Sequence, residues 1–283
     1  MKRHSTFRTI WWGCNLLLAL AILAGAWSGL WEYSVRKYLK GFADAVVPEA
    51  SSPQQKVEAI LTWMRFGPPR MEALTGEDLS PRDPQDTLNY RELLEVCGSA
   101  TNAFLNLSRS TGLQTRRLLL LSPEKTSKHV VAEVLLDGRW IVVDATYRVI
   151  MKDAHGKLLT RADLQNPQIF REATSLIPLY RPEYSYERYA HVRISRLPFF
   201  GPLIRRALDR VLPGWDENVD WSLLLERRSF LYLFSSVTVA VFLLLLRSFL
   251  AWLADHRLRI PRFHLRANLG RATAAFFTTP EIK

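Results

Sequence analysis

Cys97 is the residue of this 283-residue chain with the clearest capacity for covalent chemistry. It stands in the stretch VCGSATNAFLNLSRSTGL, in which apolar residues recur at helical spacing from Ala100 to Leu107. Cys97 therefore lies at a predicted helix N-terminus, where unpaired N–H groups and the positive end of the helix dipole favour a thiolate. Such a position can lower a cysteine pKa from about 8.5 to between roughly 3.5 and 7.5, which makes the sulfur nucleophilic at neutral pH.

A second pair of polar residues interrupts an otherwise apolar hairpin, KHVVAEVLLDGRWIVVDATY, at residues 128–147. The dipeptide Asp137-Gly138 is a strong signal for a two-residue turn. With that turn, Asp144 lies opposite Val131, and His129 shares a face with Val131 because side chains alternate along a strand. His129 and Asp144 are then diagonal neighbours with Cβ atoms about 7–8 Å apart or less, which is within hydrogen-bonding reach.

These three residues form a candidate nucleophile, base and orienting group. Asp144 would orient the imidazole of His129, His129 would take the proton of Cys97, and the thiolate would attack a carbonyl carbon. The competing interpretation is structural: a cross-strand ion pair is common on sheets, and a lone cysteine is often buried and inert.

The residues around these positions resemble the core of the transglutaminase-like superfamily. The resemblance covers about residues 86–150, and the upstream helix KVEAILTWMRF is similar to the leading helix of the family. The matching residues are a Cys at a helix start, a Gly-x-x-x-Arg turn into a strand, a His that opens the next strand and a Trp-x-x-x-Asp-x-Thr strand: Cys97, Gly112, Arg116, His129, Trp140, Asp144 and Thr146. The resemblance implies an α+β, papain-like fold with an antiparallel sheet packed on the cysteine helix. It also implies acyl transfer through a thioester, to an amine or to water.

The oxyanion hole has several candidate donors. The backbone N–H of Cys97 is one, because it lies at a helix start. Papain-like relatives often place a Gln or an aromatic donor before the nucleophile, so Gln85, Asn89 and Tyr90 are side-chain candidates. Val96, directly before the cysteine, offers no side-chain donor.

The elements that would position these residues can also be predicted. Residues 53–66 form a helix with Ser51 or Ser52 as N-cap and Gly67 at its end, and residues 68–90, rich in Pro, Asp and Gly, form a long loop. Ser99 is the predicted N-cap of the cysteine helix and Gly112 its stop. Residues 115–123 read as a strand.

Two further segments are long and apolar enough to cross a membrane. Residues 10–31 and 229–246 contain no charged side chain, and at about 1.5 Å per residue each approaches the roughly 30 Å of a hydrocarbon core. The first segment also resembles a signal peptide, because basic residues precede it and AGA at 24–26 fits a cleavage site. Both interpretations place the middle of the chain on the same side of the membrane.

The net charge of +11 lies mostly in the two tails. Residues 1–31 carry +3 and residues 229–283 carry +5, whereas the much longer segment 32–228 carries +3. A nucleic-acid-binding domain would gather its basic residues on one folded face, so this distribution argues against nucleic acid as a partner. The positive-inside rule instead places both tails in the cytoplasm, with anionic lipid headgroups as partners of the C-terminal arginines.

The predicted organisation is therefore that of a plasma (inner) membrane protein. It has a cytoplasmic tail at 1–9, a transmembrane helix or signal anchor at 10–31, an extracytoplasmic domain at 32–228, a second transmembrane helix at 229–246 and a basic cytoplasmic tail at 247–283. The core of the domain spans about residues 53–196, by the resemblance above. Because Cys14 lies inside the first span, Cys97 is a lone thiol in an oxidising compartment, where cysteines are usually paired.

The remaining polar residues have structural interpretations. His155 is a solvated loop residue, and His191 is a packing or hydrogen-bonding residue. The tyrosines at 180, 184, 186 and 189 form a half-buried β surface, with a polymer-binding groove as the alternative. Residues 201–215 form an amphipathic helix that lies on the membrane surface or packs on the domain. No metal-ligand spacing and no phosphate loop is visible, so neither a metal nor a cofactor is expected.

The predicted function is a membrane-anchored cysteine enzyme that hydrolyses or transfers amide acyl groups on peptide or envelope-polymer substrates. The alternative is a catalytically inactive binding module of the same fold in an envelope or polysaccharide-export assembly. A thiol redox protein is a third possibility, but no second cysteine is available to resolve a disulfide.

Overall fold

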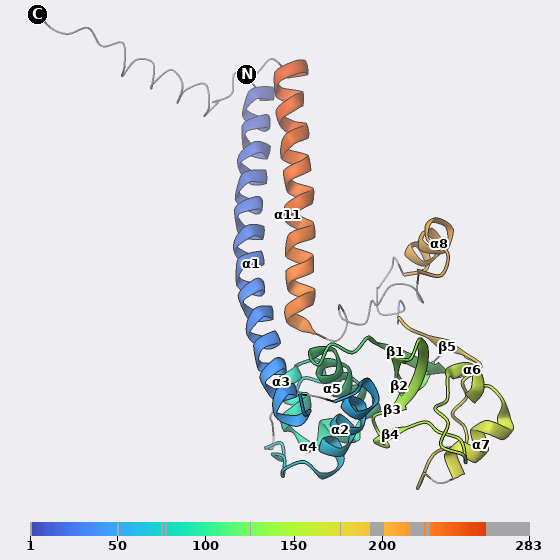
Figure 1. Cartoon of the computed structure of the whole chain (residues 1–283). Helices are drawn as coiled ribbons and strands as arrows, with labels where there is room; N and C mark the ends of the chain where they lie inside the picture. Colours follow the sequence, from blue (N-terminus) through green and yellow to red (C-terminus); the bar gives the residue numbers. More distant parts are fainter. Residues whose placement is uncertain are drawn as a thin grey trace, which may run out of the picture. The chain divides into compact units, whose positions relative to one another are not determined.

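A computed structural model describes residues 2–49, 51–74, 76, 78–124, 126–175, 177–192, 201–215, 224 and 227–258. The chain divides into two compact units, and each is described by itself. The first joins the N-terminal segment up to Trp27 with the segment from Tyr232 onward, and the second spans Ser28–Leu231. The second unit combines helices with one antiparallel sheet, which confirms the predicted α+β class (Figure 1).

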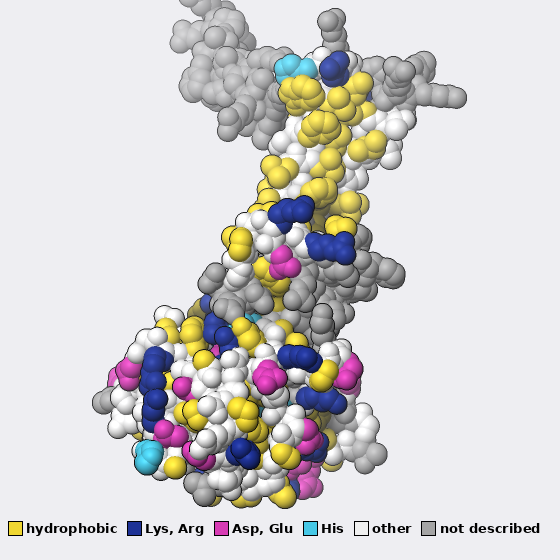
Figure 2. Space-filling view, turned by 90° about the vertical axis from the view of Figure 1, so that its right-hand side faces the viewer, with side chains coloured by type: hydrophobic (Ala, Val, Ile, Leu, Met, Phe, Trp, Pro, Cys, Tyr) yellow, Lys and Arg dark blue, Asp and Glu magenta, His cyan; other side chains and the backbone are white. Residues whose placement is uncertain are grey.

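The first unit contains parts of two long helices. Helix α1 runs from Lys2 to Val46, and α11 runs from Arg228 to Leu253 and continues into a π-helical turn at Ala254–Leu258. Both are long and apolar enough to cross a membrane, with mean hydropathies of 1.7 and 2.3 in their most apolar windows. Their outer surfaces are covered by hydrophobic side chains (Figure 2). In this unit they pack against each other through Phe7, Cys14, Leu18, Ala21, Leu243, Leu250 and Ala254.

The sheet of the second unit has five strands in the order β4-β3-β2-β1-β5, and every pair is antiparallel. The strands are β1 (Thr115–Leu121), β2 (Ser127–Leu136), β3 (Arg139–Asp144), β4 (Val149–Ile150) and β5 (Tyr189–Ala190). Strand β2 lies at the centre and is mostly buried. It is also the strand that carries His129.

Each face of the sheet packs on its own apolar core. On one face lie α2 (Pro53–Phe66), α4 (Arg91–Glu95), α5 (Cys97–Ser110) and the end of α1, whose side chains meet Ala132, Val134 and Val143 of the sheet. On the other face lie α6 (Arg161–Leu164) and α7 (Pro167–Ser175), which pack with Leu118, Val131, Val142 and Tyr186. The sheet is thus covered on both sides, with the cysteine helix on one side only.

The hairpin between β2 and β3 has the predicted register. Asp137 and Gly138 both have positive φ, 48° and 76°, as a two-residue type I′ turn requires. The pairs run from Leu136↔Arg139 to Ala132↔Val143 without a shift. A turn of two residues therefore sets which face every side chain of both strands occupies.

Helix α2 begins and ends as predicted. Ser52 is the N-cap, and Gln55 completes a capping box, since its side chain accepts from the Ser52 N–H at 2.8 Å. The helix ends at Gly67, whose N–H donates to Trp63 O. The predicted loop at 68–90 is partly wrong, because Asp83 caps a short helix, α3 (Pro84–Asn89). An aspartate followed by proline is typical of a helix start. A loop is predicted because the whole segment is rich in Pro, Asp and Gly.

The sequence predicts no element for residues 32–46, but the structure continues α1 through them. Val35, Leu39 and Ala43 are buried in the same core as α2 and α5. The predicted amphipathic helix at 201–215 is present as α8 (Gly201–Val211). The predicted basic tail lies outside the described residues beyond position 258, as does most of the segment between α8 and α11.

Candidate active site

Cys97 is the first residue of α5. Val96 occupies the N-cap position and makes no side-chain cap hydrogen bond. The prediction that Ser99 is the N-cap is therefore wrong: Ser99 lies in the first turn, and its N–H donates to Val96 O at 3.1 Å. The helix therefore starts three residues earlier than predicted, at Cys97 and not at Ala100. Cys97 is thereby placed where the first N–H groups of the helix have no intrahelical acceptor.

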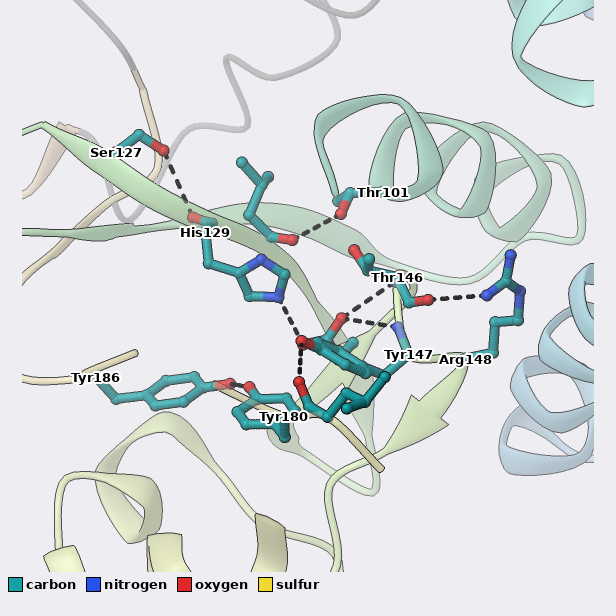
Figure 3. Close-up of polar contacts among 11 residues, drawn as sticks. Thr101, Ser127, His129, Thr146, Tyr147, Arg148, Tyr180 and Tyr186 are labelled. Atoms are coloured by element: carbon teal, nitrogen blue, oxygen red, sulfur yellow. Dashed lines mark hydrogen bonds and ion pairs between the residues drawn. The ribbon is translucent and has the colours of Figure 1, made fainter. Parts of the chain in front are cut away.

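His129 and Asp144 meet as the hairpin register requires. His129 Nε2 lies 2.7 Å from Asp144 Oδ2, and the two side chains are 1% and 0% exposed (Figure 3). Water therefore cannot compete for this contact, and a hydrogen bond between charged groups is stronger where water is excluded. The bond uses one ring nitrogen of His129, so the other, Nδ1, is the nitrogen left for a second partner.

Asp144 is held by the backbone that follows it. Its Oδ1 accepts from the N–H of Thr146 at 3.1 Å and from the N–H of Tyr147 at 3.3 Å (Figure 3). The hydroxyl of Tyr180 is also hydrogen bonded to this carboxylate. Each oxygen of a fully buried carboxylate thus has a donor, which is the condition for keeping such a charge buried.

The thiol of Cys97 interacts with the imidazole of His129. The Cys97 side chain is half-buried, and its pKa responds first to the imidazole and more weakly to the backbone N–H groups of Val130 and Gly98. The imidazole hydrogen bond, supported by the charge of His129, outweighs burial and lowers the pKa of Cys97 below its ordinary value. Burial alone would lower the pKa of His129, but Asp144 and Cys97 together raise it to about 9. The lowered pKa of Cys97 and the raised pKa of His129 both favour a thiolate beside an imidazolium.

The three residues come from both sides of the sheet. Helix α5 packs on the face formed by Ala132 and Val134. His129 lies on the opposite face, together with Val131. The hydroxyl of Thr101, one turn into α5, donates to Val130 O at 2.9 Å (Figure 3). This bond ties the start of the cysteine helix to the residue beside His129. The site therefore forms near the N-terminal end of β2, where the first turns of α5 meet this strand.

A cluster of tyrosines covers the His129–Asp144 pair. The ring of Tyr184 stacks on the imidazole with 4.2 Å between centroids and 2° between planes. Tyr147 and Tyr180 approach the same imidazole edge-on, at 6.0 and 6.4 Å. The predicted half-buried β surface is therefore wrong for residues 180–186, which form turns over the site, and only Tyr189 lies in a strand.

The tyrosine hydroxyls form a chain of hydrogen bonds around the pair. The hydroxyls of Tyr180 and Tyr186 are hydrogen bonded at 3.3 Å, and the hydroxyl of Tyr147 donates to Leu179 O at 3.1 Å (Figure 3). Tyr184 lies close enough to Tyr147 for their hydroxyls to interact. Burial, with the nearby Tyr147, raises the pKa of Tyr184 to about 12. Burial likewise raises the pKa of Tyr180 and of Tyr186. These groups are therefore neutral at physiological pH and act as donors or as apolar walls.

The three residues predicted as side-chain donors to the oxyanion make contacts with other parts of the domain. Asn89 donates to Tyr38 Oη at 3.3 Å, and Gln85 is exposed in the first turn of α3, where its N–H donates to Asp83 Oδ1. Tyr90 follows α3 and pairs through its backbone with Met71. The oxyanion role of these three residues stays a prediction. In contrast, the backbone N–H groups at the start of α5 lie beside the thiol itself.

The other histidines have other surroundings. His155 is exposed in a turn, and His191 is buried with its Nδ1 2.7 Å from Arg117 O, as the sequence predicts for both. Within the described part of the chain, no group of three or more His, Cys, Asp or Glu side chains could hold a metal ion.

Sequence reasoning missed the role of the tyrosines as neighbours of the site. Tyr147 follows the Asp-x-Thr signature directly, so its position beside Asp144 could have been inferred from the turn. Tyr184 has no such signal, because 55 residues separate it from the imidazole on which it stacks.

Comparisons with known proteins give one family match and one match to a solved structure. The core of the transglutaminase-like superfamily matches residues 40–145. No curated protein matches the sequence significantly. A crystal structure described as a "Putative Cysteine Protease from Cytophaga hutchinsonii" aligns at 22% identity and a TM-score of 0.29, over 44% of this chain and 40% of its own length. Residues 40–145, which contain the cysteine helix and the hairpin with its His–Asp pair, therefore carry a transglutaminase-like domain.

Proposed function

We propose that this protein is a membrane-anchored cysteine enzyme that cleaves amide bonds in peptide or envelope-polymer substrates through a thioester. One observation carries the proposal: the imidazole of His129 lies 2.7 Å from the Asp144 carboxylate and also interacts with the Cys97 thiol, whose pKa it lowers. A structural ion pair accounts for the first contact only. The interaction with Cys97 supports a nucleophile–base–orienter arrangement.

The first half-reaction forms the thioester. The Cys97 thiolate attacks the amide carbonyl carbon, so a C–S bond forms and the carbonyl π electrons move onto oxygen. The His129 imidazolium then donates its proton to the amide nitrogen, the C–N bond breaks, and the amine leaves. Asp144 keeps the ring oriented and stabilises its positive charge before the proton is given up.

The second half-reaction releases the acyl group. Water or an acceptor amine loses a proton to neutral His129 and attacks the thioester carbonyl, and the C–S bond breaks. The sulfur leaves as a thiolate beside the newly formed imidazolium, which restores the starting charges. The product is a carboxylic acid if water attacks and a new amide if an amine attacks.

The developing oxyanion needs donors near the sulfur. The backbone N–H of Cys97 lies at the first position of α5, where no intrahelical carbonyl can accept from it. Such a donor stabilises the tetrahedral intermediate more than the planar ground state. Gln85, Asn89 and Tyr90 remain the side-chain candidates for a second donor.

The thiol chemistry is tested with the full-length protein in detergent or nanodiscs. Cys97→Ala should abolish turnover and labelling by a thiol-directed electrophile at pH 7. Cys14→Ala is the matched control, because Cys14 is buried between α1 and α11 and should not affect either signal. Full turnover by the Cys97→Ala protein would refute the mechanism.

The acyl acceptor is tested by mass spectrometry on peptide substrates with and without an added primary amine. A mass increase of one water marks hydrolysis, and attachment of the amine marks transfer. If neither product forms and the labelling pKa of Cys97 is near 8.5, the inactive binding module is favoured instead.

The helices and the charges support a proposed cellular location. Helices α1 and α11 have the length and apolarity of membrane spans, and the basic excess lies in the two tails. We propose that both tails are cytoplasmic and that the domain faces outward from the plasma membrane. Membrane-impermeant maleimide on intact cells tests this orientation: it should label Cys97 from outside, and labelling only after lysis would contradict it.

A further inference from the structure

A basic pocket lies beside the candidate active site, between α2 and the edge strand β4. It has a volume of about 360 Å³, and its charged wall consists of Glu58 and Arg65 from α2 with Arg148 and Lys152 from the segment that contains β4. Strand β4 follows Asp144 by a short turn, so the pocket and the site share one connection.

The charges of this pocket do not cancel. Lys152 Nζ lies 3.4 Å from Glu58 Oε1, and this pair is neutral as a whole. Arg65 and Arg148 supply two further positive charges. Burial, with the positive charge of Arg65, lowers the pKa of Arg148, although Glu95 acts in the opposite direction. The positive charge of Arg70 also lies close enough to act on Arg148.

The two pocket arginines are fixed by carbonyl groups. Arg65 Nη2 donates to Arg148 O at 2.7 Å, and Arg148 Nε donates to Met64 O at 3.1 Å. Carbonyl oxygens orient a guanidinium without neutralising its charge. Little side-chain entropy is therefore left to lose when an anion binds, which favours binding.

The backbone at Arg148 supports a functional interpretation. Its φ of 59° lies in the left-handed region, which costs a residue with a Cβ about 1 kcal/mol or more. Glycine or asparagine would adopt this conformation more easily. Arginine occupies this costly conformation here, and residues with strained backbones often lie at binding sites.

The pocket is coupled to the triad by short links. Arg148 Nη1 donates to Thr146 O at 3.0 Å, and the N–H of Thr146 donates to Asp144 Oδ1 at 3.1 Å (Figure 3). Glu95, whose charge acts on Arg148, stands two positions before Cys97 in the chain. A substrate that extends from Cys97 past the Asp144 turn would therefore reach this pocket.

We propose that the pocket binds a carboxylate of the substrate and so selects acidic peptides. This inference rests on the proposed function for its substrate but not for the binding itself. The chemistry is that of an oxyanion held by preoriented guanidinium groups, in which one charge-assisted hydrogen bond contributes about 1.5–3 kcal/mol. Free phosphate shares this chemistry and is the alternative source of the anion.

Binding is measured with fluorescein-labelled hexaglutamate and the Cys97→Ala full-length protein, so that no turnover occurs. Arg65→Met should weaken binding about tenfold or more, and Arg65→Lys should restore part of it. Arg171→Met is the matched control, since Arg171 lies exposed on α7 and its side chain donates to Pro167 O of its own helix. Hexaglutamine should bind none of these proteins measurably.

A second variant gives an effect that misfolding cannot imitate. Glu58→Gln removes the acidic partner of Lys152 and should tighten hexaglutamate binding several-fold. Equal affinity of the unsubstituted, Arg65→Met and Glu58→Gln pockets would overturn the proposal, and so would displacement of hexaglutamate by equimolar inorganic phosphate. Labelling of Cys97 in proteins that retain it reports the catalytic proposal separately, so the two can fail independently.

Discussion

At the scale of single residues, the reactivity of the site depends on the charge states of Cys97 and His129, which stabilise each other. The imidazolium stabilises the thiolate, and the thiolate together with Asp144 holds the imidazolium protonated to about pH 9. Acylation needs both charges, whereas alkylation of the sulfur needs only the thiolate. The pH dependences of the two reactions should therefore differ.

The first prediction is that turnover and alkylation separate above pH 9. Turnover should rise with pH through the lowered pKa of Cys97 and fall as His129 loses its proton, with an apparent pKa of about 9. Alkylation should rise through the same lowered pKa and then stay constant. His129→Gln should move the alkylation midpoint up toward about 8.5. Parallel loss of alkylation and turnover above pH 9 would contradict the ion pair.

The second prediction concerns Tyr184, whose ring lies flat on the imidazole. An aromatic face stabilises a stacked cation by about 0.5–2 kcal/mol. Tyr184→Leu should therefore lower the alkaline apparent pKa of turnover by roughly 0.5–1 unit, since one unit corresponds to about 1.4 kcal/mol. Tyr184→Phe retains the ring and should retain the alkaline apparent pKa of turnover. If this pKa is the same in the unsubstituted, Tyr184→Leu and Tyr184→Phe proteins, Tyr184 is only a packing residue.

At the scale of elements, the hairpin of β2 and β3 sets the site geometry. Its register rests on a turn in which Asp137 and Gly138 both adopt positive φ. His129 and Asp144 lie beyond the last regular pair of β2 and β3, so any slip of the pairing would turn one of them to the opposite face.

The third prediction is that Gly138→Val destabilises the domain without altering the reactivity of the folded protein. A branched side chain at φ 76° should cost about 1–2 kcal/mol or more. The five regular pairs of the hairpin should still hold the register. Chemical denaturation measures the loss, and alkylation of Cys97 at pH 7 measures the site. An unchanged denaturation midpoint, or a changed alkylation pKa, would contradict this account.

At the scale of the whole molecule, helix α1 does not end where the predicted membrane span ends. Helix α1 continues to Val46, and Val35, Leu39 and Ala43 are buried in the core that α5 shares. The superfamily match also begins at residue 40, within this helix. The last turns of α1 therefore belong to the domain.

The fourth prediction is that a domain fragment of residues 33–192 is more stable than one of residues 53–192. Full burial of each aliphatic side chain contributes about 1.5–3 kcal/mol, so losing the end of α1 should cost several such increments. Urea denaturation compares the two. Leu39→Ala in the longer fragment, where Leu39 is 0% exposed, should cost about 2–5 kcal/mol by itself. Equal midpoints for both fragments would show that α1 contributes nothing to the domain.

The sequence by itself determined the local features of the site. The Asp137-Gly138 turn specifies a hairpin register, and that register alone brings His129 and Asp144 together. Helical periodicity after Cys97 places the thiol at a helix start. These signals act within about twenty residues, where turn chemistry and side-chain alternation leave few alternatives.

Only the tertiary structure decided which distant segments complete the site. The contact of Cys97 with His129 needs α5 to pack on the far face of the sheet, and the position of Tyr184 needs a turn far along the chain to fold back over the imidazole. The start of α5 at Cys97, three residues before the predicted one, and the burial of Leu39 were likewise decided only in the tertiary structure. Contacts of this kind depend on the shape of the whole core and have no counterpart in a local pattern.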